Sequence, residues 1–234
     1  MGLKEKQENL YVRVSKGAFW IKTDSSDKKA IASRYKDDEG NEKITYRRKY
    51  GEVSGLVTDI YYTSNEFGGK LNIVIEDDNR YILQLPDERK LTNFVINLLL
   101  NDELDFSKEI SFIARTDKSK YTTVFVIQNN KYIKAKYSKA NNNIDEVPTA
   151  KKIKRGNITK WDFTDANTFF AERVEKELAP KIREIHGIYN KDYENKPDTQ
   201  EYDEQPGDPI PEDPSPEDPS NKIDFSDKAD DLPF

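Results

Sequence analysis

The sequence predicts a mainly β fold with one inserted helix, a second helix after the last strands and a disordered acidic tail. Between residues 11 and 138 most segments are rich in Val, Ile, Thr, Tyr and Phe, and several alternate apolar with polar residues as half-buried strands do. Two other segments repeat apolar residues at the spacing of an amphipathic helix. The last 44 residues contain 8 of the 11 prolines and only 8 hydrophobic residues, a composition that prevents a packed core.

The first strands are expected in chain order. Residues 11–35 form an extra strand region, and residues 43–64 form one long strand or two, bent near Gly51 or Gly55. Two alternating strands follow, separated by a turn of Asp and Asn residues. The apolar residues of these two strands share one side, so their outward positions are Lys70, Asn72, Val74, Arg80, Ile82 and Gln84.

The spacing then changes to that of a helix. Within residues 87–102 one helix face carries the apolar residues Leu91, Phe94, Val95, Leu98 and Leu99. Two more strands are expected in residues 108–116 and 121–138, and the second can form a hairpin about Asn129-Asn130. Three strands, a helix and two strands is the order of an OB-fold, a five-stranded barrel with a helix between strands three and four that binds single-stranded nucleic acid on one face.

A second helix is expected from Asp165 to about Gly187, with Asp165 as its N-cap and a kink or break at Pro180. The chain is therefore predicted to have two parts. Residues 1–190 form the OB-fold domain, with its C-terminal helix at about 165–187, and residues 191–234 form the disordered tail. The tail carries 15 Asp and Glu against 4 Lys, whereas the body is mildly basic. This asymmetry suggests an interaction tail joined to a body that binds polyanions.

The composition disfavours several kinds of site. The chain has no Cys and a single His, His186, so thiolate metal sites are excluded, and His-rich metal sites and Ser-His triads are unfavoured. Glu76, Asp77 and Asp78, with Asp59 on a neighbouring strand, could serve a metal-dependent nuclease, but Asp and Asn at such a place are more typical of a hairpin turn. We therefore expect no enzymatic activity and no cofactor.

Three basic segments, residues 43–50, 131–139 and 151–161, interleave Lys and Arg with aromatic rings. Single-strand binding needs both, because cations contact phosphates and flat rings stack on bases. A solvated sheet face protected by lysines is the alternative for any one segment, but three segments together favour binding. The candidate nucleic-acid-binding residues are Lys43, Tyr46, Arg47, Arg48, Lys49, Tyr50, Tyr61, Tyr62, Phe67, Lys70, Arg80, Tyr132, Lys134, Lys136, Tyr137, Lys154, Arg155 and Trp161.

The sequence ends in Asp230, Asp231, Leu232, Pro233 and Phe234. This tip resembles the C-terminal tip of bacterial single-stranded DNA-binding proteins, which follows a disordered linker and docks on replication and repair enzymes. An OB-fold body with extra N-terminal strands, a C-terminal helix and an acidic tail is similar in architecture to the phage-encoded type of that family. The resemblance implies that the five tip residues bind partner proteins, with the Phe234 ring and α-carboxylate entering one pocket.

The sequence thus predicts a protein that coats single-stranded DNA during phage DNA replication, recombination or repair. Its tip would recruit a polymerase, helicase, nuclease or recombinase. The resemblance to phage proteins implies the host bacterial cytoplasm, which the absence of Cys fits, and no membrane span or signal peptide is expected. The second helix could cap the barrel or form a dimer interface, so the sequence is compatible with a monomer or with a homo-oligomer. The alternatives are an RNA-binding OB-fold or cold-shock-like protein, a metal-dependent nuclease, and an adaptor whose body binds only protein.

Overall fold

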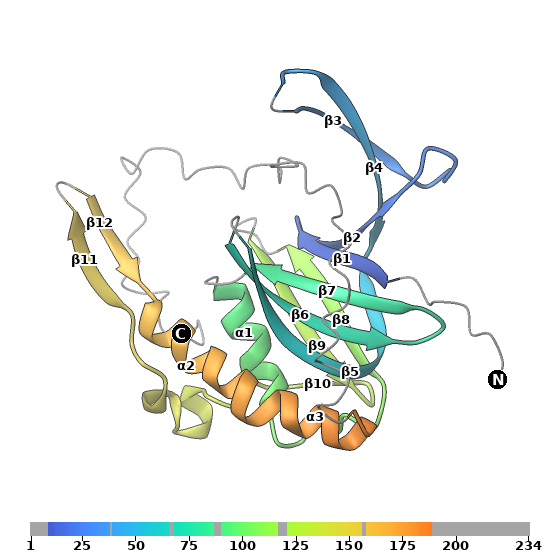
Figure 1. Ribbon diagram of the computed structural model, residues 1–234. Coiled ribbons are helices and arrows are strands. Elements are labelled where there is room, and N and C mark those ends of the chain that lie inside the picture. Colours follow the sequence, from blue (N-terminus) through green and yellow to red (C-terminus); the bar gives the residue numbers. More distant parts are fainter. Residues whose placement is uncertain are drawn as a thin grey trace.

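The computed structural model describes residues 9–37, 39–65, 68–86, 90–116, 121–155 and 158–188 (Figure 1). The expected tail and its partner-binding tip, Asp230 to Phe234, lie outside these residues, as does the expected binding residue Phe67. The described part is mainly β, with helices near the C-terminal end of the described chain, as the sequence predicts.

Within the described residues, ten strands form one sheet with the hydrogen-bonded order β10-β9-β8-β5-β6-β7-β1-β2-β4-β3. β11 and β12 form a separate two-stranded sheet. The strands are β1 (Asn9–Ser15), β2 (Ala18–Thr23), β3 (Ile31–Lys36), β4 (Glu42–Tyr50), β5 (Glu52–Asn65), β6 (Gly68–Glu76), β7 (Arg80–Pro86), β8 (Ile110–Thr116), β9 (Thr122–Gln128), β10 (Lys131–Tyr132), β11 (Lys151–Arg155) and β12 (Ile158–Asp162).

Two tight hairpins have the turn residues that their geometry requires. Asn129 and Asn130, between β9 and β10, have φ values of 52° and 59°. Lys16 and Gly17, between β1 and β2, have φ values of 49° and 66°. Positive φ at both central residues is the signature of a type I′ turn, whose twist matches that of paired strands and which favours Asn and Gly. The hairpin predicted at Asn129-Asn130 is confirmed.

The long strand β5 bends so that it pairs with two different neighbours. Its first residues pair with β8 and its later residues pair with β6, with a register shift between Val57 and Asp59. Gly55 lies just before this shift with φ 151°, and a Cβ there would lie 2.5 Å from the Glu76 carbonyl oxygen. Only glycine allows so close an approach of two backbones. Gly51 separates β4 from β5, so each of the two alternative positions predicted for a bend marks a change in the chain path.

The order of β5, β6, β7, a helix, β8 and β9 agrees with the expected three strands, helix and two strands. A closed five-stranded barrel is not confirmed, because β7 pairs in parallel with β1 and the described sheet continues outward to β3. The backbone of the β1–β2 turn lies against threonine side chains of β8 and β9. The Gly17 amide donates to Thr122 Oγ1 at 3.0 Å, and a Cβ on Gly17 would lie 2.1 Å from Thr116 Oγ1.

One hydrophobic core lies on the inner face of the curved sheet. Ile60, Ile73, Leu83 and Val12 occupy neighbouring positions across β5, β6, β7 and β1, and all are fully buried. The predicted helix at residues 87–102 is confirmed as α1 (Lys90–Leu99), whose Val95, Leu98 and Leu99 join this core. Apolar burial of this kind stabilises the fold by about 25 cal/mol per Å².

The C-terminal helix has three consecutive parts: α2 (Thr164–Arg173), a π-helical turn (Val174–Leu178) and α3 (Ala179–His186). Pro180 lies in the first turn of α3, directly after the π turn. Because proline has no N–H to donate to the preceding turn, the regular α-helical hydrogen-bond pattern is interrupted here. The expected N-cap at Asp165 is wrong, since Asp165 lies inside the first turn. Asp162 instead accepts the Thr164 amide at 3.0 Å.

Two hairpins project from the body, β3–β4 on one side and β11–β12 on another (Figure 1). α2 and α3 run along the body below the strands, with α3 against β5 (Figure 1). None of the helices in the described ranges has the length and apolar character needed to cross a bilayer.

Candidate nucleic-acid interface

A single row of side chains crosses six neighbouring strands on the outer face of the sheet. Directly paired residues share a face, so each pair in the register extends the row by one strand. At about 4.8 Å per strand, five gaps give a row of about 24 Å. We call this set the cross-strand row: Tyr61 on β5, Asn72 on β6, Gln84 on β7, Arg13 on β1, Trp20 on β2 and Lys49 on β4.

Trp20 lies between two cations in this row. Its indole Nε1 donates to the Ser15 carbonyl at 2.9 Å, which fixes the ring orientation. Lys49 Nζ lies 5.9 Å from the ring centroid, at the outer limit of a cation–π contact, and Arg13 is the partner on the other side. The indole is half-buried, whereas Arg13 and Lys49 are exposed. A partly exposed ring flanked by cations suits a stacked base with neighbouring phosphates.

The middle of the row is a chain of amides. Gln84 Nε2 donates to Asn72 Oδ1 at 3.1 Å, and Asn72 Nδ2 donates to Thr63 Oγ1 at 2.9 Å. Asn72 is buried and Gln84 is half-buried. The Asn72 amide is thereby satisfied within the protein, so Gln84 is the amide that remains accessible to a ligand.

A charged group lies beside the Tyr61 end of the row. The Arg183 guanidinium on α3 donates to Asp59 Oδ1 at 2.9 Å, and the Asp59 side chain is 4% exposed. Burial raises the pKa of Asp59, while Arg183 opposes that rise. Burial also raises the pKa of Tyr61, with smaller contributions from Tyr11 and Asp59. The Asp59–Arg183 pair therefore joins the C-terminal helix to the strand that presents Tyr61.

The predicted basic segment of β4 divides between the two faces of the sheet. Arg47 and Lys49 share the outer face with Trp20, and Lys43 lies on the same side with its Nζ 3.2 Å from Asp37 Oδ2. The other face of β4 carries the three remaining candidates of this segment. Tyr46, Arg48 and Tyr50 point to that side, with Arg48 5.1 Å from the Tyr50 ring and Tyr50 packed against the core.

The candidates on β5, β6 and β7 also separate by face. Lys70 and Arg80 lie on the outer face, as the alternation of their strands predicts, and Tyr61 lies on the same face. Arg80 Nε lies 3.6 Å from Glu76 Oε1. Tyr62 lies on the opposite face and packs against the hydrophobic core. Two of the predicted outward positions, Val74 and Ile82, are buried, so this part of the outer face is partly covered.

The segment after β9 corrects one prediction. Tyr137 is only 3% exposed and packs edge-on against Phe169 and Phe170, so it is not placed to stack on bases. The last strand of this segment ends at Tyr132. Further on, the side chain of Asn97 on α1 takes the place of a neighbouring strand: the Tyr137 amide donates to Asn97 Oδ1 at 2.8 Å, and Asn97 Nδ2 donates to the Tyr137 carbonyl at 3.0 Å. The expected strand to residue 138 therefore ends early.

Other candidates of that segment remain at the surface. Tyr132 is 54% exposed and packs edge-on against Phe125, and its hydroxyl lies 3.4 Å from Arg115. Lys134 is exposed, and Lys136 Nζ lies 3.2 Å from Asp102 Oδ1. Tyr132 thus belongs to a small aromatic and cationic cluster on the outer side of β8, β9 and β10.

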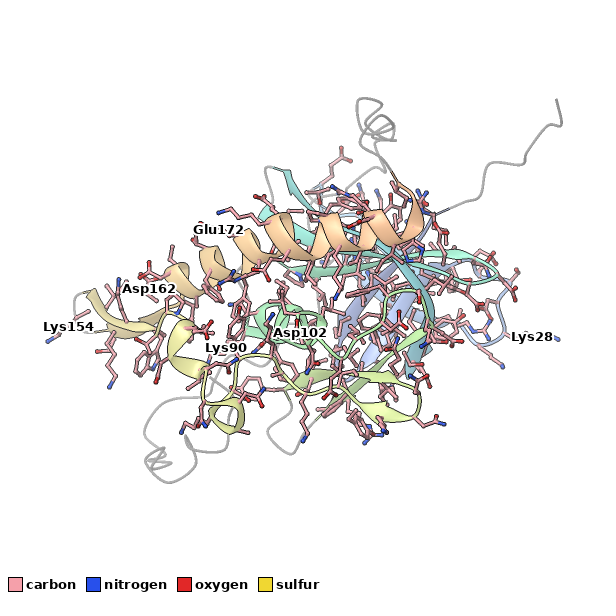
Figure 2. The ribbon with its side chains drawn as sticks, turned by 90° about the horizontal axis from the view of Figure 1, so that it is seen from below. Lys28, Lys90, Asp102, Lys154, Asp162 and Glu172 are labelled. Carbon is pink, nitrogen blue, oxygen red and sulfur yellow. The ribbon has the colours of Figure 1, made fainter. Side chains whose placement is uncertain are left out.

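The candidates in the third basic segment lie on the β11–β12 hairpin. Trp161 is 56% exposed and Lys152 Nζ lies 4.9 Å from its ring centroid. Lys154 is exposed at one end of the molecule (Figure 2). The strand includes Arg155, whose side chain is outside the described set.

The acidic turn behaves as a hairpin connection. The Asp77 amide donates to the Asn79 carbonyl at 3.0 Å, and Asp59 pairs with Arg183. In the part of the chain that the structure describes, no three His, Cys, Asp or Glu side chains gather as a metal site requires.

Arg13 and Trp20 were not among the residues predicted from the sequence. The segment 18–23 carries a signal that could have identified Trp20, because Phe19 and Ile21 alternate with Trp20 and Lys22. Such alternation sets the aromatic and the cation on the face away from the core. Arg13 could not be found in this way, since its place depends on the parallel pairing of β1 with β7.

Comparison with known proteins gives one distant similarity. The chain is 27% identical over 152 residues to a UvrABC system protein C of Thermosipho africanus (strain TCF52B), a match that covers 62% of this chain and 27% of that protein. The chain thus spans about a quarter of the length of that relative. No family model matches the chain, and no solved structure matches it significantly.

Proposed function

We propose that this protein binds single-stranded DNA on the outer face of its sheet, along the cross-strand row. The observation that carries the proposal is the position of Trp20 between Arg13 and Lys49, in register on three adjacent strands. Bases would stack on the exposed part of the Trp20 ring, and the two flanking cations would contact phosphates. Tyr61 and Gln84 would extend the path toward β5.

The proposed fold is an OB-fold elaborated by N-terminal strands. The order of β5, β6, β7, α1, β8 and β9 supports it, as does the bend of β5, which shares its two halves between β6 and β8. In such folds the faces of the second and third strands bind oligonucleotides. β6 and β7 would take these places here, and β1–β2–β4 would widen the binding face.

The proposed biological role is that of a phage-type single-stranded DNA-binding protein acting in a bacterial cytoplasm. The acidic sequence of residues 191–234 and the tip Asp230 to Phe234 support recruitment of a replication, recombination or repair enzyme. The acidic tail would also compete with DNA for the cationic face at high effective concentration. Deletion of residues 224–234 should therefore raise affinity for DNA at low salt and abolish partner binding.

Competition binding tests the proposed ligand. A labelled oligo-dT is bound to the full chain, and unlabelled oligo-dT, a matched RNA and a DNA duplex are added in turn. We expect oligo-dT to displace the label more readily than the duplex, because stacking needs unpaired bases, and more readily than the matched RNA. Preferential displacement by RNA would assign the protein to RNA instead. Failure of the full chain and of the tail-deleted chain to bind oligo-dT at low salt would reject nucleic-acid binding.

A further inference from the structure

The β11–β12 hairpin forms its own sheet, apart from the ten-stranded one. Figure 1 shows it projecting from the start of α2, away from β1 and β2, which carry Arg13 and Trp20 of the cross-strand row. Figure 2 places Lys154 of the hairpin and Lys28 of the β2–β3 connection at opposite ends of the molecule. The hairpin is therefore a surface separate from the cross-strand row.

The hairpin carries an aromatic ring that has one cation beside it and is otherwise exposed to solvent. Lys152 and Trp161 are direct cross-strand partners, and Lys152 Nζ lies 4.9 Å from the ring centroid. Trp161 is nevertheless 56% exposed. Lys154 and Thr159, the next pair on the same face, are also exposed. An exposed indole beside two lysines has no role in the hydrophobic core.

Contacts at its base hold the hairpin in place. Lys151 Nζ pairs with Asp165 Oδ2 at 2.6 Å at the start of α2, and Lys90 of α1 lies 4.8 Å from the ring centroid of Phe163. A two-stranded hairpin alone is marginally stable in water. These contacts join the base of the hairpin to α1 and α2 and leave Trp161 accessible.

We propose that the β11–β12 hairpin is a second contact for single-stranded nucleic acid, in which a base stacks on Trp161 and Lys152 and Lys154 contact phosphates. This inference rests on the proposed function and assigns it a second surface. Residues 151–162 hold five Lys and Arg against one Asp, so the ligand is anionic. The exposed indole distinguishes a nucleic acid from an acidic peptide, because a peptide of Asp and Glu would use the lysines but offer no flat ring for stacking.

The two tryptophans of the chain allow each surface to be observed by itself. In the full-length variant Trp20→Phe, Trp161 is the remaining tryptophan, and its fluorescence is followed during titration with oligo-dT longer than about 16 nucleotides. The expected result is saturable quenching, with no quenching by polyglutamate of similar charge. An unchanged Trp161 signal at saturating oligo-dT would overturn the inference. Equal quenching by polyglutamate would also overturn it and would assign the hairpin to acidic peptides, the chain's own tail included.

Substitutions separate the ring from the charges. Trp161→Ala should weaken oligo-dT binding by about 5-fold to 150-fold, whereas Trp161→Phe should retain most of the affinity because a stacking ring remains. The double variant Lys28→Ala, Lys29→Ala removes two cations at the opposite end and should leave Trp161 quenching intact. Equal affinity of Trp161→Ala and the native chain would contradict the second contact.

The outcomes also separate this inference from the proposed function. If Trp20 in the variant Trp161→Phe reports oligo-dT binding while Trp161 in Trp20→Phe does not, the cross-strand row stands and the hairpin contact is wrong. If neither tryptophan responds and no oligo-dT is bound, both proposals fail.

Discussion

Lys49 and Trp20 are direct cross-strand partners on β4 and β2, with Lys49 Nζ 5.9 Å from the centroid of the Trp20 ring. The pairing places a cation of β4 beside an aromatic ring of the neighbouring strand β2. Arg13 lies opposite Trp20 on the other side. This arrangement supplies stacking and charge at one place, and the first two predictions follow from it.

Replacing Trp20 by Ala should weaken binding of oligo-dT by about 1–3 kcal/mol, because one stacked base loses its platform. Trp20→Phe should bind nearly as well as the native chain, since it keeps an aromatic face. Fluorescence anisotropy of labelled oligo-dT measures both affinities. Equal binding by Trp20→Ala and the native chain, at equal thermal stability, would show that Trp20 takes no part.

The variants Arg13→Ala and Lys49→Ala should each reduce the salt dependence of binding. The slope of log affinity against log salt should become shallower by about 0.7 for each phosphate that the variant no longer neutralises. Lys176→Ala is a suitable control, since Lys176 lies on the C-terminal helix and its Nζ pairs with Glu172 at 2.7 Å. If the salt slope of Lys176→Ala changed as much as those of Arg13→Ala and Lys49→Ala, the effect would not come from local contacts of Arg13 and Lys49 with phosphates.

Arg183→Met should lower the free energy of unfolding by about 3–5 kcal/mol, because the buried Asp59 carboxylate loses its partner. Asp59→Asn in the same chain should recover part of that loss. Burial already raises the pKa of Asp59, so the ionised form is the costly one in the variant. Lowering the pH toward that raised pKa should therefore reduce the difference in free energy of unfolding between the native chain and Arg183→Met. Urea denaturation at pH 5 and pH 7 measures this difference. A larger difference at pH 5 than at pH 7 would contradict the burial of an unpaired carboxylate.

Gly17→Ala should destabilise the protein by about 1–3 kcal/mol, since Gly17 has φ 66° and a Cβ would lie 2.4 Å from the Thr116 amide nitrogen. The turn between β1 and β2 would have to withdraw from β8. Gly51→Ala is the matched control, because a Cβ at Gly51 meets no atom within 4 Å. Thermal unfolding compares the two variants. Equal midpoints would mean that the turn is not seated against β8.

Asp105→Asn should change the response of stability to acid. Hydrogen bonds from Lys108 and Ser107 lower the pKa of Asp105 to about 2. The ionised carboxylate therefore stabilises the fold above its unfolded pKa of about 3.9, and this contribution is lost as the pH falls toward 2. The native chain should melt above the variant at pH 6, and the two midpoints should converge near pH 2. A constant difference across that range would contradict this role.

Much of the local structure follows from the sequence. The alternation of β6 and β7 predicts correctly which residues face the core, as Ile73 and Leu83 show. The spacing of Val95, Leu98 and Leu99 identifies α1, and Asn129-Asn130 identifies a tight hairpin. These features depend on near neighbours in the chain, for which periodicity and turn preferences are sufficient.

The rest depends on contacts between distant segments. The parallel pairing of β1 with β7, which brings Arg13 beside Gln84, joins residues about 70 positions apart. Tyr137 is buried because Asn97 binds its backbone and Phe169 and Phe170 cover its ring. The basic segment of β4 divides between two faces because β2 pairs with it in one register. No local pattern specifies these three relationships.

The fluorescence of Trp20 in the full-length variant Trp161→Phe, titrated with oligo-dT at low and moderate salt, tests whether the outer face of the sheet binds single-stranded DNA. We expect saturable quenching at low salt that weakens as salt rises, because stacking on Trp20 is accompanied by release of counterions from phosphates. A folded variant whose Trp20 emission is unchanged at saturating oligo-dT would contradict it.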